Sequence, residues 1–326
     1  MKSRSAAAAV TLALALLVIA PATAAAQPIT LRYNWTQGDV LTYRMVVRTN
    51  TAVKGGPQGD ANIEQTMSQT VKVLVSAVGP DGTATLRQSI EAVSMEMNGP
   101  MGKLAYDSAK PPAADADPRV LSMSKTFGAM VGEALSVTMA PNGAVRRIDG
   151  TQRIVDKLMK DLPRDPMAGG MAQNIRQMLS EDALRTSLEQ SFSRMPDVPV
   201  KPGDTWTAQQ SLGADAVGKI TGTSTFTLKS IDGTGDAAVA HISVALALKQ
   251  QEVPASGSSM TMRLGANASG EGELVFHVTR GRVERNTMRT DMPSTITVRG
   301  QDGAPMTMQN NTKTTMTMEL AKQEAR

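Results

Sequence analysis

Apolar residues recur at every second position through most of this sequence. The alternation is clear over Leu41, Tyr43, Met45 and Val47, and it returns near the end, over the even positions from Met306 to Leu320. A period of two is typical of half-buried strands, because successive side chains point to opposite faces of a sheet. The sequence therefore predicts a mainly β protein with antiparallel sheets, and an open half-barrel is one arrangement that fits.

Short turn signals separate the alternating runs and favour antiparallel hairpins. Gly79-Pro80-Asp81-Gly82, Pro141-Asn142-Gly143 and Asp232-Gly233-Thr234-Gly235 each lie between two such runs. Gly, Asn and Asp are common in tight turns because they tolerate left-handed backbone conformations. In the run that follows the first turn, the alternation slips by one residue near Ala92-Val93. Such a slip would reverse the faces of the strand, so we expect a β-bulge there.

One segment follows a helical period instead. Ile154, Leu158 and Leu162 are spaced by four residues, and Ser180 precedes Glu181-Asp182 as an N-cap would. The pattern predicts two or three amphipathic helices between residues 151 and 195. Their far faces are polar, so we expect them to cover one side of a sheet.

The first 26 residues have the composition of a secretory signal. Lys2 and Arg4 precede an apolar run over residues 6–20, and Ala24-Ala25-Ala26 supplies the small residues of a cleavage site. We expect cleavage near Ala26, a periplasmic or secreted mature protein, and no transmembrane segment after cleavage. The sequence contains no Cys, which excludes disulfides and a lipid-modified N-terminal Cys.

The two β-rich parts of the chain follow the same plan. Thr36-Gln37-Gly38-Asp39 aligns with Lys201-Pro202-Gly203-Asp204, and each precedes a strand. We therefore predict a first β-rich half over residues 27–150, a helical segment over 151–195 and a second half over 196–326. The two Gly-Asp pairs could form a catalytic carboxylate couple, but turn capping explains them better, because both occur at the same place before a strand.

These motifs resemble a family of uncharacterised, exported bacterial proteins that contain a domain of unknown function. The similar segments are Asn34–Asp39, with the pattern W-x-x-G-D, Met195–Trp206, with the pattern P-x-x-P-V-x-x-G-D-x-W, and Ser269–Glu273. The resemblance implies an exported, β-rich protein. It carries no catalytic residues over to this chain.

Little in the sequence suggests catalysis. There are only two histidines, His241 and His277, and both are expected at the protein surface, on the outer face of a strand. No nucleophile elbow, phosphate-binding loop or dinucleotide fingerprint occurs. We expect a non-enzymatic protein without a cofactor. Losing Lys2 and Arg4 lowers the formal net charge from +4 to +2, which gives no reason to expect nucleic-acid binding.

Methionine is the strongest chemical signal, with 22 residues against nine aromatics. Eight methionines form Met-x-Met pairs, which place both side chains on one face of a strand. These candidate ligand-binding residues are Met95, Met97, Met260, Met262, Met306, Met308, Met316 and Met318. They fit a core that lacks aromatics, an adaptable apolar surface or, less well, a Cu(I) site, which would need a compact cluster of thioethers.

Two classes of function remain. In the leading hypothesis, the exported protein binds an apolar or amphiphilic ligand, such as a lipid, on a Met-lined sheet face. The alternative is a structural or interaction module of the cell envelope whose partner is another envelope protein. A Cu(I)-binding protein is the less favoured third hypothesis.

Overall fold

The structure is a computed structural model that describes residues 27–56, 59–160, 176–177, 179–212, 220–251, 260–299 and 304–324. The predicted signal peptide, residues 1–26, lies outside the described residues, as does the segment 161–175 within the expected helical region.

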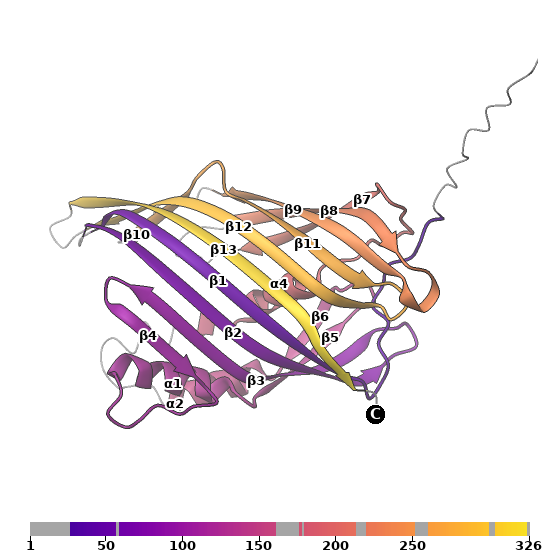
Figure 1. The fold of residues 1–326 in the computed structure, drawn as a ribbon, viewed down its shortest axis with the longest axis horizontal. Coiled ribbons are helices and arrows are strands. Elements are labelled where there is room, and N and C mark those ends of the chain that lie inside the picture. Colours follow the sequence, from indigo (N-terminus) through magenta and orange to yellow (C-terminus); the bar gives the residue numbers. More distant parts are fainter. Residues whose placement is uncertain are drawn as a thin grey trace, which may run out of the picture.

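Most of the chain forms one antiparallel sheet (Figure 1). Its strands are β1 (Val40–Gly56), β2 (Gly59–Val78), β3 (Ala84–Gly99), β4 (Gly102–Asp107), β5 (Ala134–Met139), β6 (Val145–Asp149), β7 (Thr205–Leu212), β8 (Ile220–Asp232), β9 (Val239–Gln250), β10 (Met260–Leu264), β11 (Ser269–His277), β12 (Arg282–Arg299) and β13 (Pro305–Glu324). The mainly β, antiparallel fold predicted from the alternation is confirmed.

The helices lie against this sheet. They are α1 (Pro118–Met130), α2 (Thr151–Lys160) and α4 (Glu181–Phe192), and Gly235–Ala237 forms a short 3₁₀ turn. The Ser180 side chain accepts a hydrogen bond from the Ala183 amide, as the predicted N-cap requires. Helices α2 and α4 fall within the predicted helical segment, whereas α1 was not predicted.

The sheet is open, and α4 spans the gap between its two ends. The strand order is β6-β5-β3-β2-β1-β13-β12-β11-β9-β8-β7, with β4 beside β3 and β10 beside β12. Helix α4 contacts both end strands, β6 and β7, and also β12 in the middle of the sheet. The curved sheet therefore forms a trough, and α4 lies behind the long front strands (Figure 1). We call the sheet face toward α4 the inner face.

The order of strands in the sheet is the same in both halves of the chain. The run β6-β5-β3-β2-β1 corresponds to β12-β11-β9-β8-β7, and β13 joins the two runs. The Gly-Asp turns also form the same backbone hydrogen bonds. Gly38 and Asp39 exchange bonds with Val75, at 2.9 and 2.9 Å, and Gly203 and Asp204 do so with Leu228, at 2.7 and 3.0 Å. Both Gly-Asp pairs thus form equivalent structural turns, and the Asp204 side chain also accepts a hydrogen bond from the Lys201 amide at 2.9 Å.

One end of the trough is filled by the main core. Five of the nine aromatic residues meet there, although they lie far apart in the sequence. Phe192 of α4 makes edge-on contacts with Tyr33, Trp35 and Tyr43, with ring centroids 5.8–6.3 Å apart, and Tyr33 contacts Phe276 in the same way at 5.5 Å. Aromatic pairs prefer this geometry. The cluster fixes the C-terminal end of α4 to the inner face.

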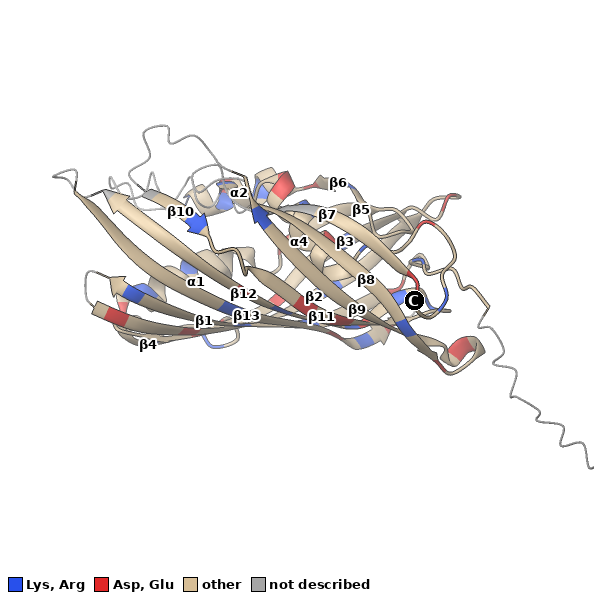
Figure 2. Cartoon of the chain, turned by 90° about the horizontal axis from the view of Figure 1, so that it is seen from above, with Lys and Arg blue, Asp and Glu red and all other residues tan. Residues whose placement is uncertain are grey.

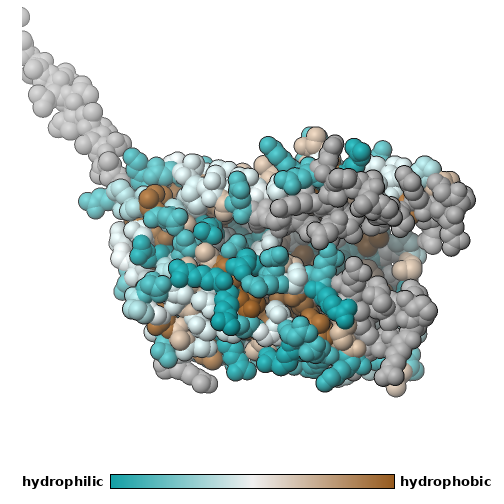
Figure 3. Space-filling view, turned by 180° about the vertical axis from the view of Figure 1, so that it is seen from behind, coloured by the Kyte–Doolittle hydropathy of each residue, from teal (hydrophilic) through white to brown (hydrophobic). Residues whose placement is uncertain are grey.

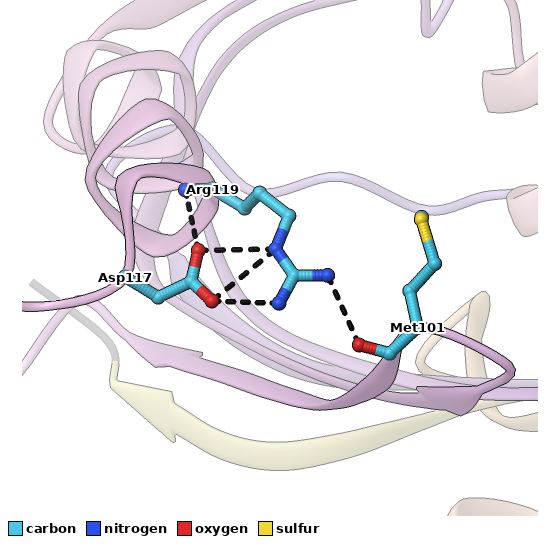
Figure 4. A network of polar contacts seen from close by, with 3 residues as sticks. All are labelled: Met101, Asp117 and Arg119. Carbon is cyan, nitrogen blue, oxygen red and sulfur yellow. Dashed lines mark hydrogen bonds and ion pairs between the residues drawn. The ribbon is translucent and has the colours of Figure 1, made fainter.

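A second, smaller core lies under α1 and α2. It contains Ile154, Val155 and Leu158 of α2, and Met130 of α1 packs against it. Asp117 caps α1 by accepting a hydrogen bond from the Arg119 amide, and the Arg119 guanidinium binds the same carboxylate and the Met101 carbonyl (Figure 4). The Arg119 hydrogen bonds lower the pKa of Asp117 to about 2. This network ties α1 to the turn between β3 and β4.

The predicted bulge and turns also occur in the structure. Register along β2 and β3 shifts at Glu91, because Thr70 pairs with Ala92 and Val71 with Ile90. The bulge thus lies one residue before the predicted position. Gly143 adopts a positive φ of 83° in its turn, where an added Cβ would lie 2.5 Å from the Ser193 carbonyl oxygen. Glycine is required there both by conformation and by this close approach.

Candidate functional site

The inner face is not filled along its whole length. Beyond the aromatic core lies a cavity of about 740 Å³. Its walls come from β1, β7, β8, β9, β10, β12 and β13, from the C-terminal end of α4, and from the segment Ser193–Val198 that follows this helix. The volume lies within the range of roughly 300–1,000 Å³ that is common for small-molecule sites. From the side opposite to that of Figure 1, hydrophobic surface is visible in hollows between hydrophilic side chains (Figure 3).

One wall of the cavity is apolar. Leu246 and Leu248 of β9 and Ile220 of β8 are buried there. They form a hydrophobic cluster with partly buried side chains of β10 and β12, namely Met262, Leu264, Met288 and Met292. The aromatic side of this wall is Trp206, whose ring stacks on Phe226 at 5.5 Å between centroids. An acyl chain or a similar apolar group could replace water against this surface.

Uncharged polar side chains also line the cavity, and on β12 they alternate with the methionines of the apolar wall. Thr312 and Thr314 of β13 line the cavity, with Thr290 and Ser294 on β12. The Thr314 hydroxyl lies 3.3 Å from that of Thr49, and the Thr312 hydroxyl lies 3.2 Å from that of Thr51. We call Thr290, Ser294, Thr312 and Thr314, together with Asn310, which pairs in register with Ser294, the polar band. The cavity is therefore amphipathic.

A set of hydrogen bonds holds the helical wall in place. Asn286 on β12 is 4% exposed, and its amide group donates to the carbonyl oxygens of Gln190 and Ser191, at 3.0 and 2.9 Å. The indole N–H of Trp206 donates to the Arg194 carbonyl at 2.8 Å. The Tyr33 hydroxyl donates to the Ser193 carbonyl at 3.2 Å. These hydrogen bonds satisfy buried polar groups, and they also fix the direction of the chain after α4.

The predicted methionines are distributed along the inner face. Met262 and Met316 line the cavity, whereas Met318 is buried in the main core. Met306 and Met308 pair with Val298 and Ile296 of β12. On the other side of β12, Met260 and Met262 pair with the same two residues, although the side chain of Met260 is not described. Two predicted pairs thus flank β12 at the end of the trough away from the aromatic core.

The remaining predicted pair lies in the other half. Met95 and Met97 belong to β3, where Met95 pairs with Met67 of β2 and Met97 with Gln65. Strands β2 and β1 separate this pair from β13 in the sheet. The eight methionines therefore do not form one compact cluster. A single Cu(I) site would need such a cluster.

Several residues of the cavity were not among the predicted ligand-binding residues. These are Met195, Trp206, Asn286, Met288, Met292, Thr290, Ser294, Thr312 and Thr314. A signal for Met288 and Met292 was available in the sequence, because an even spacing places both side chains on one face of a strand. The segment after α4 includes the start of the Met195–Trp206 motif, but nothing in that motif indicated a place in a cavity, because the position of the segment also depends on distant contacts such as that of Ser193 with Tyr33.

One prediction about the histidines is wrong. His241 is on the outer face as expected and contacts Asp232 and Glu273, at 3.3 and 3.2 Å. His277, however, is only 5% exposed. Burial lowers its pKa, so the neutral form is favoured. Neither histidine lines the cavity.

In the described parts of the chain, no three His, Cys, Asp or Glu residues are placed to bind a metal ion together. No helix in these parts has the length and apolar character needed to cross a membrane.

Residues 81–281 match the model of a family described as a family of unknown function (DUF6263). The chain belongs to this family. The match covers more than half of the sequence and includes the segment Met195–Trp206 and the Ser269–Glu273 motif. The resemblance to an uncharacterised domain of unknown function is therefore confirmed. No curated protein matches the sequence.

Two solved structures show a distant likeness. One, titled as a study of lipid–protein interactions in lipovitellin, is 8% identical with a TM-score of 0.46, and the match covers 89% of this chain and 26% of that chain. The chain thus spans about a quarter of that protein's length. The other is DynF from the dynemicin biosynthesis pathway of Micromonospora chersina, 8% identical with a TM-score of 0.20, covering 88% of this chain and 83% of that chain. Neither likeness bears on what the cavity binds.

Proposed function

We propose that this protein is exported and binds an apolar or amphiphilic molecule, such as a lipid, in the trough without acting on it chemically. The observation that carries the proposal is the cavity itself. It is about 740 Å³ in volume, its lining combines apolar side chains with uncharged polar ones, and none of the described strand residues that line it is charged. Pockets for small molecules are commonly lined by apolar side chains with a few placed polar groups.

The arrangement of the sheet supports this proposal. The aromatic cluster closes one end of the trough, and α4 with the following segment forms a wall held by Asn286 and Trp206. The cavity is thus a fixed feature of the fold. Methionine side chains on its walls can adapt to the shapes of different acyl chains. The expected export from the signal-like N-terminus would place such a binder outside the cytoplasm.

A single substitution in the cavity wall tests whether the ligand binds in the cavity and not elsewhere on the protein. Leu248 lies on the apolar wall and is buried, whereas its neighbour Lys249 is exposed on the outer face. We expect Leu248→Trp to reduce ligand occupancy by about tenfold or more, because the larger indole side chain would take up space that the ligand needs. Forcing extra volume into packed space typically costs roughly 1–3 kcal/mol. Native mass spectrometry of the protein purified from envelope extracts would measure the bound mass.

Lys249→Trp is the matched control and should retain the ligand. The melting temperature of both variants would show whether each has folded. If the wild-type protein carries no small molecule but retains an envelope protein, the carrier proposal fails and the interaction module is favoured. If Leu248→Trp folds and keeps its ligand, the molecule binds elsewhere and the cavity assignment is wrong.

A further inference from the structure

The cavity walls also indicate which chemical class of amphiphile would fit. We propose that the ligand is neutral, with hydroxyl, ester or amide groups as its polar part, and that an acylglycerol-type molecule is preferred to an ionised fatty acid. This inference rests on the proposed function and adds a head-group preference to it. Three observations about the described residues lead to it.

The first observation is the separation of charge between the two faces of the sheet. On β12 and β13, charged side chains pair on the outer face, as Arg285 does with Glu319 at 2.9 Å and Asp291 with Lys313 at 3.6 Å. Their neighbours on the inner face are Asn286, Met288, Thr314 and Met316. Charged residues are spaced among uncharged ones along the strands (Figure 2). An ion buried against the inner face would lose its hydration and gain no opposite charge there.

The second observation concerns the charged side chains among the described residues that line the cavity, which come from α4 and the segment after it. They are Glu189, Arg194 and Asp197. One Glu189 oxygen accepts a hydrogen bond from the Val145 amide at 3.1 Å, and one Asp197 oxygen accepts one from the Asn142 side chain at 2.8 Å. Two carboxylates and one guanidinium give this wall a formal charge of −1. Such a balance does not favour an anionic head group.

The third observation is the hydrogen-bonding capacity of the polar band. Each of the pairs Thr49–Thr314 and Thr51–Thr312 shares one hydrogen bond between two hydroxyl groups, so each pair keeps one O–H to donate. Asn310 pairs in register with Ser294, which lines the cavity. Its side-chain oxygen is buried and accepts no hydrogen bond from any residue that the structure describes. The band can therefore donate to ester oxygens and accept from hydroxyl groups.

Competition between matched acyl probes tests the inference. Monooleoylglycerol and oleate carry the same chain, and at pH 8 the oleate carboxyl is ionised because its pKa lies far below that value. Each would displace a neutral fluorescent acyl probe from the full mature chain, below the concentration at which the lipids aggregate. We expect monooleoylglycerol to displace the probe at concentrations about tenfold lower than oleate.

A pair of variants locates the preference in the polar band. The double variant Thr312→Val/Thr314→Val removes two hydroxyl groups and keeps the shape of the side chains. The control Thr317→Val removes one hydroxyl group on the outer face of β13. We expect the double variant to bind monooleoylglycerol about five- to tenfold more weakly and to bind oleate as tightly as the wild-type protein does. Thr317→Val should change neither. Melting temperatures would confirm that the variants are folded.

Each outcome has a distinct meaning. Equal displacement by the two lipids, or stronger displacement by oleate, would overturn the neutral-ligand inference and leave the proposed lipid-binding function standing. Failure of the acyl probe and of both lipids to bind would overturn the proposed function, and the inference with it. A double variant that retains the preference would show that the polar band does not recognise the head group.

Discussion

Gly272→Ala is expected to lower the free energy of unfolding by about 2–3 kcal/mol, at the upper end of what overpacking usually costs. Gly272 of β11 pairs with Met288 on one side and with Val244 on the other. An added Cβ would lie 2.3 Å from the Thr287 carbonyl oxygen and 3.0 Å from the Met288 sulfur. The oxygen belongs to the backbone, so relief requires β11 and β12 to move apart. Chemical denaturation monitored by circular dichroism would measure the loss.

A second glycine provides the control for this prediction. Gly128 lies in helix α1, and a Cβ there would meet only the Tyr106 hydroxyl, at an ordinary distance of 3.5 Å. Gly128→Ala should raise stability by up to about 1 kcal/mol, because alanine favours a helix interior. If both substitutions had the same small effect, the close approach of β11 and β12 at Gly272 would not be a determinant of the fold.

Phe192→Ala should have an effect at least as large. The Phe192 side chain is 3% exposed and contacts the rings of Tyr33, Trp35 and Tyr43. Removing a buried aromatic side chain typically costs about 3–5 kcal/mol, because a cavity remains in its place. The loss would also free the end of α4 from the inner face, and with it one wall of the cavity. Thermal and chemical unfolding would measure the cost.

Ser187→Ala tests whether this effect is specific to the buried face of α4. Ser187 belongs to the same helix and is exposed. Surface substitutions of this kind usually change stability by less than about 0.5 kcal/mol. A Phe192→Ala protein that is as stable as the Ser187→Ala protein would contradict the role of the aromatic cluster in holding α4.

The strands were predictable because their signal is local. Alternation over β1 and β13, and the turn residues at Gly82 and Gly143, depend only on neighbouring side chains. Helix α4 was predictable for the same reason, from the Ser180 cap and the spacing of Leu184, Leu188 and Phe192. Helix α1 could have been found from Asp117 followed by Pro118, which is a common start of a helix.

The cavity was only partly predictable. Strand parity placed Met262 and Met316 on one face, and both line the cavity. Parity does not show where a core ends along the strands, however, and so it did not separate Met318, which is in the core, from Met316. The empty space depends on where Phe192 and Asn286 hold α4 and on which strand lies beside which. These are long-range contacts that leave no periodic pattern in the sequence.

The gathering of the aromatics shows the same limit. The nine aromatic residues are spread along the sequence, yet Tyr33, Tyr43, Phe192 and Phe276 meet in one core. His277 was misplaced because its outward position on β11 suggested exposure to solvent, whereas the folded chain buries that position. In both cases, tertiary packing determines the environment of the side chains, and local alternation in the sequence does not reveal it.

Tryptophan fluorescence offers the most direct test of binding in the cavity. Of the two tryptophans in the sequence, Trp206 lines the cavity and Trp35 is buried in the aromatic core. In a Trp35→Phe background, a monoacylglycerol with bromine atoms along its chain should quench most of the Trp206 emission at saturation, because the heavy atoms would lie close to the ring. The unbrominated lipid should cause no quenching. Saturable binding of the brominated lipid without quenching of Trp206 would contradict the central claim that the trough holds the ligand.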